Sequence, residues 1–195
     1  MSMKSKKKLT HRFEAKHHRG LESQYRRRIL PPTKILKSFG LRRGMKVADV
    51  GAGTGYFLIP AARIAGQQGK AYAIDVSEEM LRILSKKRLP RNTVIVHSSD
   101  GYSFDVLSSE VDFAVASAIL HENDPDQFLR EVRRIMKRHG KLLIIEWKKT
   151  SQYGPPSYEK LEQDDVVRIL RRNRFRPIIS RSLNARYYAV LSEKA

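Results

Sequence analysis

The 195-residue sequence contains no cysteine. It therefore forms no disulfide bond, and no thiolate is present to act as a nucleophile or to bind a metal ion. Among the histidines only His17 and His18 are adjacent, and neighbouring positions point in different directions on a helix or a strand. We therefore expect no metal site in this chain.

Long apolar stretches are also missing. No run approaches the roughly 20 apolar residues of a membrane-spanning helix, and the first residues lack the apolar segment of a secretion signal. We therefore expect a cytoplasmic protein. The length is that of one globular domain, which is sufficient to bury a hydrophobic core.

Acidic residues are few, since 20 Asp and Glu stand against 39 Lys and Arg and the net charge is +19. A field of this sign attracts RNA and other polyanions, although a basic surface that is merely well solvated is equally expected. We predict that residues 1–30 form a basic tail and lid segment ahead of a single domain at 31–195. Two further basic sets occur later in the chain: Arg133, Arg134, Lys137, Arg138 and Lys141, and then Arg168, Arg171, Arg172, Arg174, Arg176 and Arg181.

The most informative stretch is residues 46–56, KVADVGAGTGY, in which a short apolar run leads into three glycines, Gly51, Gly53 and Gly55. The pattern predicts a buried strand, a sharp turn and then a helix over Tyr56–Ala65. The glycines allow positive φ and let a ligand lie against the backbone, and the helix directs its free N–H groups at that ligand. These features indicate a site for an adenosine-containing molecule, whereas a tight turn without a ligand is the alternative.

The spacing of the glycines separates two classes of ligand. Dinucleotide-binding proteins use G-x-G-x-x-G, whose N–H groups face a pyrophosphate, but here Tyr56 occupies the position of the third glycine. Asp49 precedes the turn and would repel a pyrophosphate, while its carboxylate would accept hydrogen bonds from an ammonium group. The pattern therefore disfavours NAD and favours an adenosine ligand that carries an ammonium group.

A second predicted strand, Ala71–Asp75, ends in an acid. Asp75 follows the last glycine by about 20 residues, and an acid at that place accepts hydrogen bonds from the ribose hydroxyls of an adenosine ligand. Ser77 is predicted to cap the next helix. The first turn of that helix contains Met80, which is either a cover for the adenine face or a core residue.

The remaining pattern alternates strands and helices. Further strands are predicted at 93–97, 111–116, 141–147, 178–183 and 187–191. Helices are predicted at 21–30, 33–39 and 161–173. Two more helices are predicted to begin at Ser77 and at Asp124, and the second of these is predicted to end at Gly140. Such a chain, ending in an antiparallel hairpin, predicts an α/β fold whose functional loops gather at the carboxyl edge of the sheet. Ser117 and His121 follow the fourth strand and are expected at that edge.

In order and spacing, Asp49–Gly55, the acid at 75, Asp100–Gly101 and the strand leading to His121 resemble motifs of the class I S-adenosylmethionine (SAM)-dependent methyltransferases. The resemblance extends from about Lys34 to Leu191. It implies a doubly wound, seven-stranded, mostly parallel sheet with SAM as cofactor and S-adenosylhomocysteine as product. The chain is most similar to small enzymes of the ubiquinone/menaquinone-biosynthesis type, because it contains Leu-His-Glu, Glu-Trp-Lys-Lys and Gly-Pro-Pro sequences at the matching places.

The resemblance also implies the residues of the site. Asp100 would accept a hydrogen bond from the adenine amino group, the alternative being a turn or helix cap. His121 would act as general base toward an acidic acceptor, the alternative being a structural role, and Glu146 and Trp147 would line the substrate pocket. The implied cofactor-binding residues are Asp49, Gly51, Ala52, Gly53, Tyr56, Asp75, Val76, Met80, Ser99, Asp100, Gly101 and Ser117.

The lid and the methyl acceptor are less closely specified. The resemblance places Tyr25 and Arg27 in a lid over the cofactor, although packing against the outside of the sheet is also open. A small-molecule acceptor is the first hypothesis, an RNA- or ribosome-directed methyltransferase is the second, and a non-catalytic nucleotide- or RNA-binding module is the third. An arsenite methyltransferase is disfavoured by the lack of cysteine, and methylation of adenine N6 by the lack of an Asn/Asp-Pro-Pro-Tyr/Phe sequence after the fourth strand.

Overall fold

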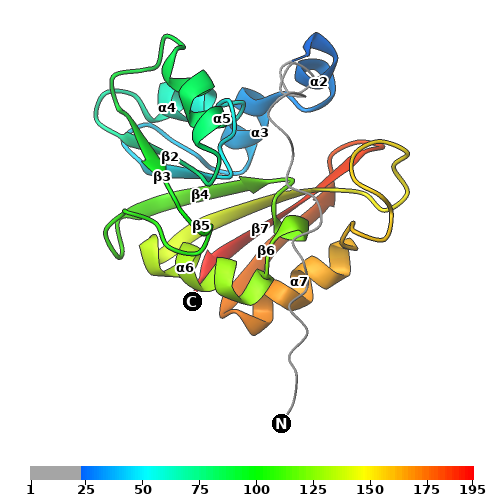
Figure 1. The fold of residues 1–195 in the computed structure, drawn as a ribbon. Coiled ribbons are helices and arrows are strands. Elements are labelled where there is room, and N and C mark those ends of the chain that lie inside the picture. The colour runs from blue at the N-terminus through cyan, green and yellow to red at the C-terminus, as the bar shows by residue number, and fades with distance from the viewer. Residues whose placement is uncertain (1–22) are drawn as a thin grey trace.

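The computed structural model describes residues 23–195, which form one seven-stranded sheet with helices on both faces (Figure 1). The strand order is β3-β2-β1-β4-β5-β7-β6. Strands β1 to β5 pair in parallel, and β7 lies antiparallel between β5 and β6. The strands are β1 (Lys46–Val50), β2 (Lys70–Asp75), β3 (Thr93–His97), β4 (Val111–Ser117), β5 (Met136–Trp147), β6 (Phe175–Ser182) and β7 (Tyr187–Lys194). The predicted fold class, including the C-terminal antiparallel hairpin, is confirmed.

Two hydrophobic clusters fill the space between the sheet and its helices. The helices are α2 (Gln24–Ile29), α3 (Pro32–Ser38), α4 (Leu58–Ala65), α5 (Glu78–Ser85), α6 (Pro125–Ile135) and α7 (Gln163–Arg172). Side chains of α3, α4 and α5 pack on one face of the sheet, and those of α6 and α7 pack on the other. Figure 1 shows these two layers, with α2 to α5 above the strands and α6 and α7 below them.

The central strands are nearly continuous apolar runs because both of their faces are covered. In β4, for example, Phe113 contributes to one cluster and Ala114 to the other. The helices begin where the sequence predicts caps: the Ser77 side chain accepts a hydrogen bond from the Met80 N–H, and Asp124 caps α6 ahead of Pro125. The helix-capping residues and the apolar strand patterns in the sequence therefore correspond to the observed elements over most of the fold.

Two predicted boundaries near the glycine turn and α6 are wrong. The helix predicted from Tyr56 begins at Leu58, because residues 51–57 form successive turns closed by bonds such as Gly55 N–H to Ala52 O, at 2.8 Å. Gly140 does not close α6, which ends at Ile135 and passes directly into β5. Pairing with the chain just before β4 ends the helix, since the Glu110 N–H donates to the Ile135 carbonyl at 2.8 Å.

Gly140 instead lies within an irregularity of β5. The register between β4 and β5 shifts between Val111 and Phe113, and His139 there has a φ of 62°. A Cβ at Gly140 would lie 2.9 Å from the Lys137 carbonyl oxygen and 3.2 Å from that of Val111. The glycine is therefore needed for close approach of two strands and not for a helix end.

The C-terminal elements differ from prediction by a few residues. Helix α7 spans Gln163–Arg172 and β6 begins already at Phe175, because Arg174 turns the chain with a φ of 60°. Residues 1–22 of the predicted basic tail lie outside the described residues. Within residues 23–195 no helix is long and apolar enough to span a membrane.

Candidate active site

The glycine turn is tied to the end of β2 at the carboxyl edge of the sheet. The N–H groups of Gly51 and Ala52 both donate to the Ile74 carbonyl, at 2.8 and 3.0 Å. One carboxylate oxygen of Asp75 accepts from the Gly53 N–H at 2.7 Å, and the other accepts from the Ser77 N–H at 2.8 Å. A carboxylate has about four acceptor positions, so Asp75 can still bind the hydroxyls of a ribose.

Gly53 is the glycine of the turn that faces open space. Gly51, Gly53 and Gly55 have φ of 81°, 52° and 91°. A Cβ at Gly51 would lie 2.9 Å from Cγ1 of Ile119, and one at Gly55 would lie 2.6 Å from Cδ1 of Leu84, but a Cβ at Gly53 would meet nothing within 4 Å. Two of the glycines therefore permit packing, and Gly53 leaves room where a ligand would cross the backbone.

A pocket opens beside this turn, between the ends of β1, β2 and β4. Its walls include Gly51, Asp75, Val76 and Gly101, which are four of the predicted cofactor residues. The rest of the lining is Val50, Ile74, Ser98, Ile119, Glu122, Asn123 and Phe128. The structure therefore brings together residues from four separate loops, with acidic groups beside an apolar wall, as a nucleoside ligand requires.

Several lining residues were missed by the sequence analysis. Ser98, next to the predicted Ser99, lines the pocket, where its hydroxyl donates to the Ser103 carbonyl at 2.7 Å and accepts from the Gly101 N–H at 3.0 Å. Ile119 and Asn123 reach the pocket because the chain bends sharply after β4. Ala118 has a φ of 56°, a left-handed backbone that alanine seldom adopts and that clusters at functional sites.

Asp49 lies beneath the glycine turn with only 2% of its surface exposed. Burial raises the pKa of this carboxyl to about 8, although a hydrogen bond from the Leu58 backbone opposes the shift, and the nearby Asp75 charge adds to it. A cation next to Asp49 would favour the charged form. The environment is therefore that of a carboxylate that gains from an ammonium partner.

Ser117 supplies a second sign that a polar ligand group belongs here. Its hydroxyl oxygen, at the carboxyl end of β4, is buried and has no hydrogen-bond partner among the described residues. Such groups are uncommon because an unsatisfied buried hydroxyl costs about 1–3 kcal/mol. The orphaned hydroxyl, the space over Gly53 and the acids at 49 and 75 fit an adenosine ligand with hydroxyl and ammonium groups.

Other predicted cofactor residues have structural contacts. The Tyr56 hydroxyl donates to the Leu30 carbonyl at 2.8 Å, and Met80 is 4% exposed in the core. One oxygen of Asp100 accepts from the backbone N–H groups of Tyr102 and Ser103, at 2.8 and 2.9 Å, as the turn alternative required. Cofactor contacts of these three side chains, and of Ala52 and Ser99, stay predictions.

His121 and Glu146 form a buried pair next to this pocket. His121 belongs to the 3-10 helix η2 (Leu120–Glu122), and its Nδ1 lies 2.8 Å from Oε2 of Glu146, near the end of β5. The other Glu146 oxygen accepts from the Leu120 N–H at 2.8 Å. Only 4% of the His121 side chain and 1% of the Glu146 side chain are exposed. Two neighbouring strand ends thus hold one imidazole in one orientation.

The pKa of His121 is raised above its ordinary value of 6.5. Burial alone lowers it, but the charge of Glu146, the hydrogen bond to that carboxylate and the weaker influence of Glu122 and Glu159 together outweigh burial. With Nδ1–H directed at Glu146, Nε2 is the nitrogen that remains to exchange a proton. Glu122 Oε1 lies 3.8 Å from this Nε2.

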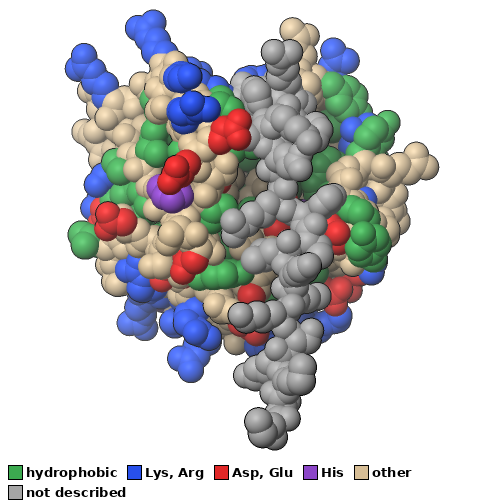
Figure 2. Space-filling model, in the orientation of Figure 1, with side chains coloured by type: hydrophobic (Ala, Val, Ile, Leu, Met, Phe, Trp, Pro, Cys, Tyr) green, Lys and Arg blue, Asp and Glu red, His purple; other side chains and the backbone are tan. Residues whose placement is uncertain are grey.

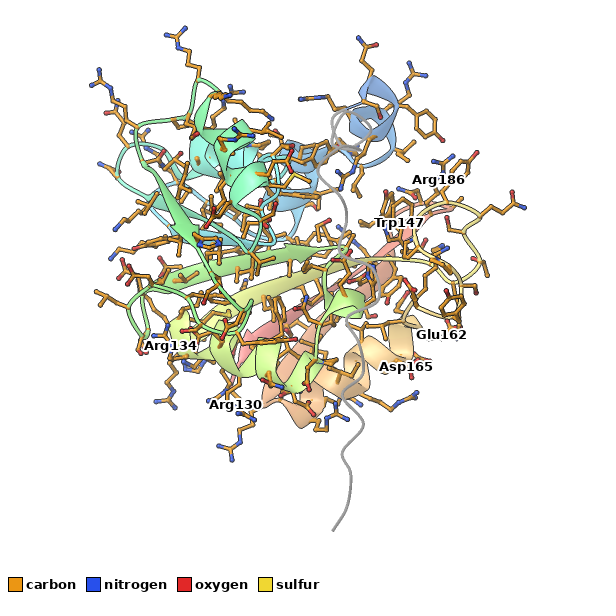
Figure 3. All side chains as sticks on the ribbon, in the orientation of Figure 1. Arg130, Arg134, Trp147, Glu162, Asp165 and Arg186 are labelled. Carbon is orange, nitrogen blue, oxygen red and sulfur yellow. The ribbon has the colours of Figure 1, made fainter. Side chains whose placement is uncertain are left out.

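Aromatic and arginine side chains meet at the same edge of the sheet. Trp147 stacks on Tyr187 with ring centroids 4.2 Å apart, and Figure 3 shows Arg186 close to Trp147 at this end of β5 and β7. The Arg186 guanidinium lies 3.3 Å from the ring centre of Tyr153 and 4.7 Å from that of Tyr25 on α2. Tyr25 therefore contacts the turn before β7 through Arg186, and its role as a lid residue stays a prediction.

Arg27, the second predicted lid residue, is exposed, and its neighbour Arg26 lies over the Tyr56 ring at 4.2 Å. Helix α2 is thus attached to the domain through Arg26. The role of this helix as a lid stays a prediction.

Five of the eleven residues in the two later basic sets form ion pairs with acidic neighbours. On the face shown in Figure 2, Asp and Glu side chains lie among the Lys and Arg side chains. The ion pairs are Arg134 with Glu131, Lys137 with Asp112, Arg168 with Asp165, Arg172 with Asp126, and Arg176 with Glu193. Within residues 23–195 no group of three or more His, Asp and Glu side chains is arranged to hold a metal ion.

Comparison with known proteins agrees with this geometry. A family model described as a methyltransferase domain matches residues 48–144. A demethylmenaquinone methyltransferase of Staphylococcus aureus is 29% identical over 130 residues, and the ubiquinone/menaquinone biosynthesis C-methyltransferase UbiE of Bordetella parapertussis is 31% identical over 122 residues. These matches cover 66% and 61% of this chain but 52% and 47% of the relatives. The chain therefore spans about half the length of the curated relatives it matches.

A solved structure matches over nearly the whole chain. The crystal structure of a SAM-dependent methyltransferase from Aquifex aeolicus is 32% identical, with a TM-score of 0.89. The match covers 94% of this chain and 100% of that one.

Proposed function

The chain belongs to the class I SAM-dependent methyltransferases, and we propose that its methyl acceptor is a small quinone-related molecule with an acidic hydroxyl or ring C–H group. Its cofactor is SAM, which supplies an activated methyl group when bound. The proposal for the acceptor is supported by the two curated relatives, whose names refer to menaquinone and ubiquinone biosynthesis. The matched segment covers only about half of those relatives, so the acceptor is inferred from chemistry in the site as well.

The residues around the glycine turn would bind and orient the cofactor. Asp75 has free acceptor positions for the ribose hydroxyls, Asp49 offers a carboxylate for the ammonium group, and Gly53 leaves the backbone open. Ile119 and Phe128 supply an apolar wall of the pocket. Holding the two reactants in line accounts for much of the barrier reduction in such a displacement, up to roughly 7–11 kcal/mol in intramolecular models.

The observation that carries the proposal is the buried His121–Glu146 pair. A hydroxyl or activated C–H must lose a proton as it becomes methylated, and in this proposal Nε2 of His121 takes that proton. Glu146 keeps Nδ1 protonated and stabilises the imidazolium that forms. Because the imidazole is shielded from bulk water, the pair favours an acceptor that fits into the site.

The test uses the full chain with methyl-labelled SAM and two matched sets of acceptors. One set consists of hydroxylated quinols, and the other consists of the same rings with every hydroxyl already methylated and every ring position substituted. We expect label in the first set only. Label in added RNA, with none in either set, would contradict the small-molecule proposal and favour the RNA-directed alternative.

A further inference from the structure

We propose that a groove between α3 and α4 binds the phosphate backbone of a nucleic acid through Lys37, Arg42, Arg43 and Arg63. These helices lie side by side on one face of the sheet (Figure 1). The groove has a volume of about 570 Å³ and shares no residue with the cofactor pocket. It is therefore a second site, separate from methyl transfer.

The groove combines a cationic rim with an apolar floor. Lys37 stands on α3, Arg42 and Arg43 lie on the turn that leads to β1, and Arg63 stands on α4. Leu41, Pro60 and Ile64 contribute the apolar lining, and no acidic residue lines the groove. Four positive charges from three segments thus face one channel without an anion among them.

These four cations differ from five cations of the other basic sets. Arg134, Lys137, Arg168, Arg172 and Arg176 are each paired with a carboxylate. The four groove side chains are exposed and form no ion pair with any acidic residue among positions 23–195. Their charges are therefore available to a ligand, whereas the charges of the paired residues are largely compensated.

The sequence around the groove is unusually poor in acids. Between Ser23 and Ile74 the buried Asp49 is the one acidic residue, whereas the same stretch contains Arg26, Arg27, Arg28, Lys34, Lys37, Arg42, Arg43, Lys46, Arg63 and Lys70. From Asp75 onward 22 Lys and Arg stand against 17 Asp and Glu, whereas from Ser23 to Ile74 ten stand against one. The net positive charge per residue is therefore highest in the stretch that contains α3 and α4.

The chemistry of the groove favours a nucleic-acid backbone over other anions. A membrane surface is disfavoured because the exposed large hydrophobic side chains that would enter a bilayer all lie outside the groove. A small anion is disfavoured because the cations are exposed and come from three segments, with no buried polar group to orient it. No aromatic side chain lines the groove, so we expect contacts with phosphates and not with bases.

The test compares two full-length variants of equal net charge. The groove variant carries Lys37→Gln, Arg42→Gln, Arg43→Gln and Arg63→Gln. The control variant carries Arg82→Gln, Lys86→Gln, Arg138→Gln and Arg171→Gln, which remove four exposed cations elsewhere. Binding of a fluorescein-labelled single-stranded RNA of about 20 nucleotides is followed by anisotropy over a range of salt concentrations. S-adenosylhomocysteine affinity, measured by calorimetry, shows that each variant is folded.

We expect the groove variant to lose at least about tenfold in RNA affinity and to reduce the salt slope by about 3, because each phosphate contact contributes about 0.7 to that slope. The control variant should bind RNA nearly as well as the wild type, and both should retain S-adenosylhomocysteine affinity. Equal loss in the two variants would overturn the proposal, as would tighter binding of tripolyphosphate or of phosphatidylserine vesicles than of RNA. Failure of the quinone-related proposal would leave these outcomes unchanged.

Discussion

Nδ1 of His121 lies 2.8 Å from Oε2 of Glu146, and both side chains are buried at the carboxyl edge of the sheet. The contact joins the ends of β4 and β5, two parallel neighbours whose last residues lie side by side. Because the second Glu146 oxygen is occupied by the Leu120 N–H, the carboxylate has little freedom to turn away. The pair thus has the geometry of an oriented general base.

The pH dependence of methyl transfer should reflect the protonation of His121 in this pair. A general base is active when neutral, and the pKa of His121 is raised, so kcat/KM should fall as pH drops through a value above 6.5. Glu146→Gln removes the nearest negative charge and should move that limb to lower pH, with a lower plateau. Glu159→Gln is the control, because Glu159 has the smallest influence of the named carboxylates on His121. A limb at the same pH in wild type and Glu146→Gln would contradict the assignment.

Asp49 should make stability depend on pH. Its pKa is about 8 in the folded chain and 3.8 in the reference state, so the protonated group contributes stability that is complete below 3.8 and lost as pH rises through about 8. Asp49→Asn keeps an acceptor for the Leu58 backbone and cannot ionise. The difference in melting temperature, Asp49→Asn minus wild type, should therefore be more positive at about pH 9 than at about pH 5. An unchanged difference across this range would show that Asp49 is not buried in its protonated form.

Alanine substitutions in the glycine turn should affect ligand binding and folding stability to different extents. Gly53→Ala places a Cβ in open space and costs about 1–2 kcal/mol of left-handed strain, so it should fold but bind S-adenosylhomocysteine at least about tenfold more weakly. Gly51→Ala should lose more stability, because its Cβ would lie 2.9 Å from Ile119. Thermal unfolding and calorimetric titration measure the two effects. Wild-type affinity in Gly53→Ala would mean that the ligand does not cross this glycine.

Much of the fold could be predicted from local sequence patterns. The alternation of apolar strands with capped helices predicted the sheet, and Asp75, the acid that ends β2, lies beside the glycine turn as predicted. These features depend on short stretches of sequence, in which burial and capping act on neighbouring residues. The end of α6 could not be predicted in this way, because it depends on the hydrogen bond from the Glu110 N–H to the Ile135 carbonyl, and these two residues are far apart in the sequence.

The site was predicted only in part for the same reason. His121 and Glu146 were each placed at the active edge, but their pairing depends on the register between β4 and β5. Ile119 and Asn123 enter the pocket because of the bend at Ala118, for which no local residue type gives a signal. Tyr56 was expected at the cofactor, yet its hydroxyl bonds to Leu30, a contact that spans α3.

The most direct measurement is single-turnover methyl transfer by His121→Gln, which retains a hydrogen-bond donor toward Glu146. With a hydroxylated quinol as acceptor, we expect a rate lower than the wild-type rate by roughly 10²–10⁴-fold, because general-base catalysis typically contributes that much. S-adenosylhomocysteine affinity should be unchanged, which excludes a folding defect. A wild-type rate in His121→Gln would contradict the assignment of His121 as the proton acceptor.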